Sequence, residues 1–218
     1  MNKYSKIFEY DGYYQDFLND EGISLENHHE LIGPYKMDLD HEAFINFFTD
    51  EDHRTYQTKH YVPRPFYPRP DMIQAVCLMH LGYNEHNSFE RSVGHTPADT
   101  ESLRKLIGEE NFAKIKMDPS TCLIRMLQYT PGNGIPLHTD SYNGFQALYG
   151  QPAEGKRIAR FCCLLKPWDW GQFLQIHDNM IHHWDVGDTY EIPAGVYHTS
   201  ANFGISKKYT LTLTGFVE

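Results

Sequence analysis

The residues best suited to chemistry lie in one short stretch, in which His138 and Asp140 stand two positions apart. The segment that leads to them is predicted to be a strand from Tyr129 that turns on a proline and two glycines. Alternate residues of a strand point to the same face, so an imidazole nitrogen and a carboxylate oxygen can reach one point in space. Both are metal-ligand groups, but two ligands alone do not make a site.

A third ligand is predicted at His198, at the end of the segment Gly-Asp-Thr-Tyr-Glu-Ile-Pro-Ala-Gly-Val-Tyr-His that begins at Gly187. A strand, a Pro-Ala-Gly turn and a second strand would bring this histidine back across the sheet, opposite His138. Two neutral imidazoles and one carboxylate on a rigid sheet form the facial triad of non-haem Fe(II) oxygenases, which leaves three coordination positions open. Catalytic zinc is the competing interpretation, because it accepts the same ligands.

Chance is the alternative to this site, because the chain has 13 histidines and a lone His-x-Asp pair is most often a surface turn. The order of the segments favours a site, since a strand and a turn precede the pair and an Ile-Pro-x-Gly-x-x-His segment follows it. His177, His182 and His183 are interpreted as rim or core residues, with a second metal site as the alternative. The adjacent pair cannot both point inward from one strand.

The region that carries these ligands is predicted to be mostly β structure. Short apolar or alternating segments separated by turn residues occupy 122–129, 135–139, 157–166, 172–177, 180–184, 188–192, 196–200 and 207–217. About eight short strands at this spacing predict a double-sheet jelly roll or a barrel. In the last segment, lysine and threonines alternate with apolar residues, which predicts a half-buried strand.

The preceding part, residues 1–118, is predicted to be richer in helices, so the fold class is mainly β with flanking helices (α+β). Helices are expected at Asp38–Arg54, Asp71–Leu81 and Thr100–Lys116, the last with Asp99 or Thr100 as its cap and a break at Gly108. A short strand is expected near Lys6–Tyr10. No flexible linker separates the two parts, so residues 1–218 are expected to form one domain with 119–218 as its β core.

Three segments are expected to be irregular. Tyr61–Pro70 holds four prolines in eight positions, which neither a helix nor a central strand accommodates. It is interpreted as a rigid connector or as a wall over the active site. Residues 83–98 are predicted to be a polar loop, and Ser141–Glu154 is predicted to be a loop that lines the mouth of the site.

Composition excludes several classes of function. The formal charge of −10 disfavours a general binder of nucleic acids or anionic membranes. No apolar run is long enough to span a bilayer, and the first ten residues lack the apolar core of a signal peptide. The four cysteines, Cys77, Cys122, Cys162 and Cys163, form no Cys-x-x-Cys pair, so they are expected to be reduced and packed in a cytoplasmic protein.

From Cys122 to Phe216 the chain resembles the Fe(II)- and 2-oxoglutarate-dependent dioxygenases, with the prolyl 4-hydroxylase and aspartyl/asparaginyl β-hydroxylase types as the nearest branches. The resemblance rests on the His-x-Asp pair, the later histidine and a lysine ten positions beyond it. It implies a double-stranded β-helix in which His138, Asp140 and His198 bind Fe(II). It also implies that a C–H bond is hydroxylated while O₂ and 2-oxoglutarate are consumed and succinate and CO₂ are released.

The same resemblance implies a pocket for 2-oxoglutarate, a dianion whose C5 carboxylate needs a buried cation. Lys208 stands where the family places that cation, and Tyr129, nine positions before the first histidine ligand, stands where prolyl hydroxylases place a tyrosine. Arg160 matches another co-substrate contact, with a surface salt bridge or a contact to the primary substrate as alternatives. Thr210 shares the strand face of Lys208 and can add a hydroxyl group.

Three further residues belong to this hypothesis. Arg125 shares a strand face with Tyr129 and is a weaker candidate for the pocket. Asn202 resembles the aspartyl hydroxylase pattern, and fixing a turn is its alternative role. Lys207 is expected to point away from Lys208, to the other side of the strand.

The primary substrate is expected to be a protein or peptide side chain or an amino-acid-like small molecule. No nucleic-acid or membrane partner is expected. Two other functions compete with the dioxygenase. One is a cupin-like isomerase or hydrolase that uses the same triad with zinc or manganese and ignores 2-oxoglutarate. The other is a jelly-roll binding protein without a metal.

Overall fold

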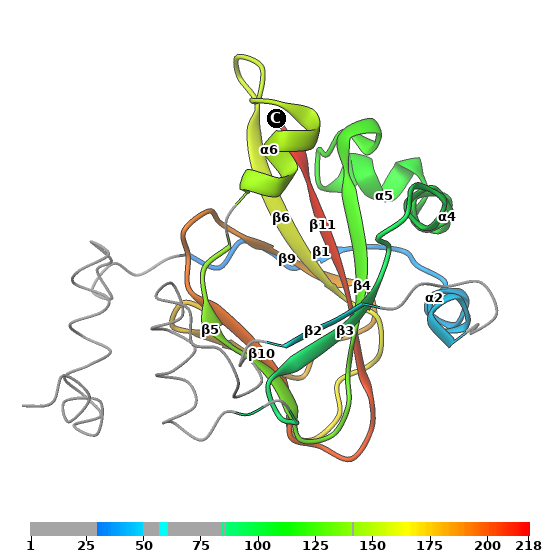
Figure 1. Cartoon of the computed structure of the whole chain (residues 1–218), viewed down its shortest axis with the longest axis vertical. Coiled ribbons are helices and arrows are strands. Elements are labelled where there is room, and N and C mark those ends of the chain that lie inside the picture. The colour runs from blue at the N-terminus through cyan, green and yellow to red at the C-terminus, as the bar shows by residue number, and fades with distance from the viewer. Residues whose placement is uncertain (1–29, 50–56, 61–83, 85, 141) are drawn as a thin grey trace, which may run out of the picture.

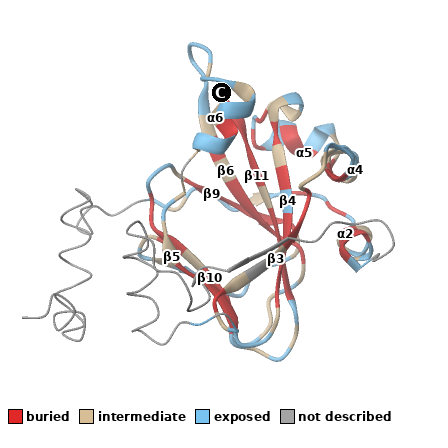
Figure 2. Ribbon diagram, viewed as in Figure 1, coloured by how far each residue is buried: buried red, intermediate tan, exposed pale blue. Residues whose placement is uncertain are grey.

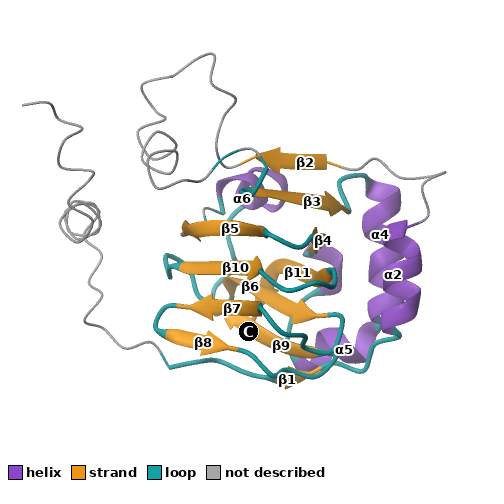
Figure 3. Cartoon of the chain, turned by 90° about the horizontal axis from the view of Figure 1, so that it is seen from below, coloured by secondary structure: helices purple, strands orange, loops and turns teal. Residues whose placement is uncertain are grey.

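Two antiparallel sheets form the body of the molecule (Figure 1). The structure is a computed structural model and describes residues 30–49, 57–60, 84, 86–140 and 142–218. The main sheet has the strand order β1 (Tyr35–Lys36), β9 (Asp188–Ile192), β6 (Arg157–Leu164), β11 (Lys208–Val217), β4 (Leu123–Tyr129), β3 (Phe89–Val93) and β2 (Gln57–His60). The small sheet has the order β5 (Asn133–His138), β10 (His198–Asn202), β7 (Gln172–Ile176) and β8 (Asn179–Ile181). Together they form a jelly roll, which confirms the predicted fold class (Figure 3).

Helices cover the side of the main sheet that faces away from the small sheet (Figures 1 and 3). They are α2 (His41–Thr49), α4 (Pro97–Ile107) and α5 (Glu109–Lys114). A fourth helix, α6 (Asn143–Tyr149), lies beside the ends of β6 and β11. The main sheet is therefore covered on both faces, by helices outside and in part by the small sheet inside.

The two faces of the main sheet pack into separate apolar clusters. Figure 2 shows buried residues along its central strands. In β6, Phe161 and Cys163 join the cluster with the helices, whereas Cys162 and Leu164 join the cluster with the small sheet. This alternation follows from the period of two along a strand. It confirms that the two adjacent cysteines face opposite sides.

Strand β11 differs from its predicted half-buried state. The apolar residues Leu211 and Leu213 are fully buried, but Lys208, Thr210 and Thr214 on the other face are also only 1%, 1% and 4% exposed. The alternation correctly predicts two distinct faces, but the polar face lies inside the jelly roll instead of in solvent. It borders a cavity, as described below.

The helices before the β core follow the predicted pattern in part. Helix α2 falls within the predicted 38–54 range and buries Phe44, Phe47 and Phe48. The predicted break at Gly108 separates α4 from α5, and this glycine has a φ of 77°. The cap differs from the prediction, because Thr96 accepts a hydrogen bond from the backbone N–H of Asp99 and a proline follows at the first helical position.

The first part of the chain also supplies strands that the sequence reading missed. The loop predicted for 83–98 contains β3, which pairs with β2 and β4. Strand β1 pairs with β9, so residues from before and after position 118 share one sheet. The loop predicted for 141–154 contains α6.

Some predictions concern other parts of the chain. The strand near Lys6–Tyr10, the proline-rich Tyr61–Pro70 and the helix Asp71–Leu81 lie outside the described residues. Within the described residues, no helix has both the length and the apolar character that crossing a bilayer would require.

Candidate metal centre

Strands β5 and β10 bring the two predicted histidine ligands together. His138 and His198 are direct register partners in this antiparallel pair, as the sequence predicted. Gly134 makes the close approach of the strands possible, because a Cβ atom there would lie 2.8 Å from the Cβ of Ala201. Asp140 corrects the prediction in one respect, since β5 ends at His138 and the aspartate lies in the irregular segment that follows.

The three side chains converge on one point. One ligand atom from each of His138, Asp140 and His198 lies within 4.8 Å of the others. The Nε2 atom of His138 is 3.8 Å from Asp140 Oδ1, and the Nε2 atom of His198 is 3.3 Å from Asp140 Oδ2. All three side chains are 20% exposed or less.

Hydrogen bonds to the backbone prepare both imidazoles for a metal. The Nδ1 atom of His138 lies 2.8 Å from the carbonyl oxygen of Pro136, and that of His198 lies 3.0 Å from the carbonyl oxygen of Val196. A carbonyl oxygen only accepts, so each Nδ1 carries the proton and each Nε2 presents its lone pair to the common point. The donor set therefore fits a divalent metal ion with open coordination positions.

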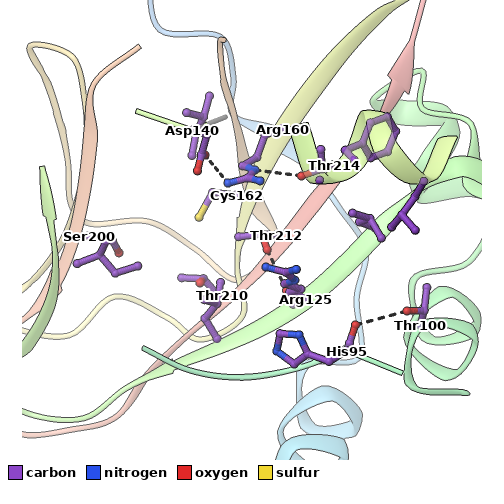
Figure 4. Close-up of a pocket in the computed structure, with 18 of the residues that line it drawn as sticks. His95, Thr100, Arg125, Asp140, Arg160, Cys162, Ser200, Thr210, Thr212 and Thr214 are labelled. Carbon is purple, nitrogen blue, oxygen red and sulfur yellow. Dashed lines mark hydrogen bonds and ion pairs between the residues drawn. The ribbon is translucent and has the colours of Figure 1, made fainter. Parts of the chain in front are cut away.

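Arg160 orients the carboxylate of this group. Its guanidinium forms an ion pair with Asp140 Oδ2, and its Nε donates to the hydroxyl oxygen of Thr214 at 3.0 Å (Figure 4). Burial alone would raise the pKa of Asp140, but the contact with the His198 imidazole and the charge of Arg160 hold it well below its usual range. The carboxylate is thus ionised at neutral pH, as a metal ligand must be.

Lys208 is a buried cation near the same strands. Its Nζ donates to the hydroxyl oxygen of Ser200 at 2.8 Å and to the carbonyl oxygen of Phe173. It also lies 5.4 Å from the ring centre of Tyr129 and 5.0 Å from that of Trp184. Among the described residues no carboxylate forms an ion pair with it, and burial lowers its pKa to about 7. Tyr129 and Lys208 therefore meet, as the sequence predicted, and they are register partners on β4 and β11.

A cavity of about 1210 Å³ lies between the metal ligands and the polar face of β11 (Figure 4). Tyr129, Arg160, Ser200 and Thr210 line it together with the three metal ligands. The Thr210 hydroxyl is buried without an oxygen or nitrogen partner among the described residues, and the Cys162 thiol lies beside it. The cavity thus contains a metal-ligand set and several polar groups on one continuous surface.

Other predicted residues have structural roles. Asn202 fixes a turn, because its amide donates to the carbonyl oxygens of Tyr129 and Ser206 and accepts from the N–H of Gly204. Arg157 forms a two-pronged ion pair with the buried Glu191, one hydrogen bond of which is 2.9 Å long.

Among the described residues, the remaining histidines do not form a second group of metal ligands. His182 and His183 are exposed and lie close to each other near Trp168. His177 pairs with Asp178. Within the described part of the chain, the only group of three or more potential metal ligands is the one at Asp140.

The sequence reading missed two partners of Lys208. Ser200 stands two positions after His198, so the period of a strand could have placed its hydroxyl on the same face. Trp184 follows β8 on the small sheet, and no spacing in the sequence connects it with β11.

Comparisons with known proteins give only remote matches. No family model and no curated protein matches the chain. A predicted oxalate decarboxylase from Thermotoga maritima has 14% identity and a TM-score of 0.34, over 60% of this chain and 83% of that one. A cupin protein from Bacteroides fragilis has 16% identity and a TM-score of 0.31, over 43% and 64%. A cupin 2 conserved barrel domain protein from Salinispora arenicola has 12% identity and a TM-score of 0.30, over 44% and 63%. At this level of similarity the matches concern the fold alone.

Proposed function

We propose that the protein is an Fe(II)- and 2-oxoglutarate-dependent dioxygenase that hydroxylates a C–H bond. In this proposal His138, Asp140 and His198 hold the iron, and Lys208 binds the far carboxylate of 2-oxoglutarate. Iron bound there would supply the oxidising power: one O₂ and one 2-oxoglutarate yield one hydroxylated product, succinate and CO₂.

The observation that carries the proposal is the buried ammonium of Lys208. Burying a charge without an opposite charge is unfavourable, and proteins retain such groups where a ligand supplies the missing partner. An isomerase or hydrolase that used only the metal would have no need for this cation. A dianionic co-substrate needs one cation at its far end and a metal at its near end. Here the metal ligands line the cavity, and the Lys208 ammonium adjoins it through Ser200, which also lines it.

The other residues have defined tasks in this proposal. The histidines keep their protons on Nδ1 through the backbone hydrogen bonds, so both Nε2 atoms stay available to the metal. Arg160 holds one oxygen of Asp140 and thereby fixes the direction of the other. The Ser200 and Thr210 hydroxyls and the Tyr129 ring would surround the carboxylate that Lys208 binds.

The direct test is succinate formation by protein loaded with Fe(II) under anaerobic conditions and then given 2-oxoglutarate and O₂. We expect turnover to disappear in Asp140→Ala and His138→Ala together with the bound iron. His182→Ala is a matched control, because it removes an exposed histidine outside the triad. Undiminished succinate formation in Asp140→Ala would refute the assignment of the metal ligands.

The co-substrate assignment has its own test. Lys208→Met should weaken 2-oxoglutarate binding by about a hundredfold, since a charge-assisted hydrogen bond and an ion pair are lost together. Lys207→Met, which changes the exposed neighbouring lysine, should leave binding unchanged. A metal-dependent activity that ignores 2-oxoglutarate and survives Lys208→Met would favour a cupin-like isomerase or hydrolase instead.

A further inference from the structure

The cavity continues beyond the groups assigned to metal and co-substrate. Its volume of about 1210 Å³ exceeds the usual 300–1,000 Å³ of a site for one small ligand. Beyond the metal ligands it is bordered by residues 94–97 and 100 near the start of α4, and by residues 144, 145 and 147–149 of α6. This outer arm has room for a second ligand.

Arg125 lies in the outer arm. It stands on β4 opposite Thr212 of β11, on the inner face of a strand that has neighbours on both sides. It is four residues, or about 13 Å along the strand, from Tyr129. Lys208 directs its Nζ to Ser200 and Phe173 on the small sheet, whereas Arg125 lies beside His95 (Figure 4). The two cations therefore serve different parts of the cavity.

The charge of Arg125 is not neutralised by the cavity wall. Arg125 is exposed and borders the cavity. Among the described residues its guanidinium forms no ion pair and no side-chain hydrogen bond. The carboxylates of the lining are engaged elsewhere: Asp140 pairs with Arg160, and Glu101 pairs with Arg104 at 2.6 Å.

The neighbouring His95 adds no second positive charge beside Arg125. Burial and the positive charge of Arg125 lower the pKa of His95 against the opposing charge of Asp99, which keeps its imidazole neutral. Its Nε2 atom lies 2.8 Å from the hydroxyl oxygen of Ser92. A guanidinium that has no ion-pair partner among the described residues and lies beside a neutral imidazole is suited to an incoming carboxylate, which it can hold with two parallel hydrogen bonds.

Apolar side chains flank Arg125 in the cavity wall. Leu123 and Leu127 stand two positions on either side of it on the same strand face. Phe145 and Leu148 of α6 border the same cavity, and Leu148 is 68% exposed there. The arm therefore combines one cation with an apolar surface.

We propose that Arg125 binds a carboxylate of the primary substrate, and that this substrate is an acid with an apolar stem. The acid is either a free small molecule or an acidic side chain of a peptide. That the stem faces the metal rests on the dioxygenase activity proposed above. The binding of the acid by Arg125 is independent of that activity. A phosphate group fits less well, because only one uncompensated guanidinium is present in the described part of this arm.

The test uses metal-loaded full-length protein with saturating 2-oxoglutarate, and calorimetric titration with matched acid and amide probes. Hexanoate is compared with hexanamide, and acetyl-Ala-Glu-Ala-amide with acetyl-Ala-Gln-Ala-amide. We expect the wild-type protein to bind one of the acids at least about tenfold more tightly than its amide. The pair that shows the larger preference identifies a free acid or a peptide as the source of the carboxylate.

The variants locate the carboxylate. Arg125→Gln should abolish the preference for the acid, Arg125→Lys should retain part of it, and Lys207→Gln should leave it unchanged. The inference is overturned if Arg125→Gln keeps the preference, if the wild-type protein shows none with either pair, or if only Lys208→Met removes it. Titration with 2-oxoglutarate alone is done first, so that failure to bind the co-substrate counts against the proposed function and not against the role of Arg125.

Discussion

Strand β11 carries two buried faces of opposite character. On the outer face, Leu211 and Leu213 are fully buried against the helices. On the inner face, Lys208, Thr210 and Thr214 are almost as inaccessible but border or adjoin the cavity. The same ten-residue strand thus contributes to an apolar core on one side and to a polar site on the other.

The difference separates residues that stabilise the fold from residues that serve a ligand. Burying a leucine side chain contributes about 1.5–3 kcal/mol to folding. Burying an ammonium or a hydroxyl without a full set of partners costs free energy. Substitutions on the two faces should therefore change stability in opposite directions, and only those on the inner face should change ligand binding.

The largest loss of stability is expected on the outer face. Leu213→Ala should lower the free energy of unfolding by about 2–5 kcal/mol, because it removes buried methyl groups and leaves a cavity in a packed core. Urea titration measures this change. Ile205→Ala is the control, since this side chain is 93% exposed and its loss should change stability little. The affinity of the remaining folded protein for 2-oxoglutarate should stay the same in both variants.

A gain in stability, instead of a loss, is expected from a substitution of Lys208. Lys208→Met shortens the side chain by one heavy atom and removes the buried charge, so it should raise the free energy of unfolding by about 2 kcal/mol at pH 7. The same variant should lose affinity for 2-oxoglutarate. Thermal unfolding with and without the co-substrate measures both effects. A destabilised Lys208→Met protein would mean that the hydrogen bonds to Ser200 and Phe173 outweigh the burial of the charge.

The difference in stability between the wild-type protein and Lys208→Met should also depend on pH, which is a smaller and more specific effect. The pKa of Lys208 falls from its usual 10.5 to about 7 in the folded protein, so between these values the unfolded chain binds the additional proton. Raising the pH in this window therefore favours folding of the wild-type protein, by at most about 1.4 kcal/mol per pH unit. The penalty is fully present below pH 7 and has disappeared above pH 10.5.

Denaturant titrations of both proteins over this pH range provide the measurement. The stability advantage of Lys208→Met should shrink as the pH rises from 7 to 10, while the other titrating groups cancel in the comparison. A constant advantage across this range would show that Lys208 titrates near its usual pKa in the folded state.

The same contrast explains what could be predicted from the sequence. The alternation along β11 and the order of strands and turns predicted the jelly roll and the pairing of His138 with His198. Periodicity separates two faces but does not tell solvent from an internal cavity, because both accept polar residues. For this reason the threonines of β11 were expected to be half exposed.

The missed elements have local causes. Strand β3 has the sequence Phe-Glu-Arg-Ser-Val, whose polar residues gave no apolar run, although Ser92 is buried. Helix α6 begins with Asn143 and Gly144, which are typical of turns. The ion pair of Arg160 with Asp140 joins two side chains from different segments, and no regular spacing in the sequence links them.

The smallest effect is expected for Thr210→Val, which removes only a hydroxyl group from the inner face. Valine has nearly the same shape, and the Thr210 oxygen has no oxygen or nitrogen partner among the described residues, so the variant should gain about 1 kcal/mol in stability. If this hydroxyl contacts the co-substrate, the affinity for 2-oxoglutarate should also fall by a few-fold.

Thr212→Val is the matched control. Thr212 is the next residue after Thr210 on the same strand face, and its hydroxyl donates to the carbonyl oxygen of Arg125 at 3.3 Å. That variant should gain no stability and should bind 2-oxoglutarate normally. If both variants behaved alike, the inner face would act as a uniform polar surface. If only Thr210→Val lowered the affinity for 2-oxoglutarate, the co-substrate would bind at the end of the cavity next to Lys208.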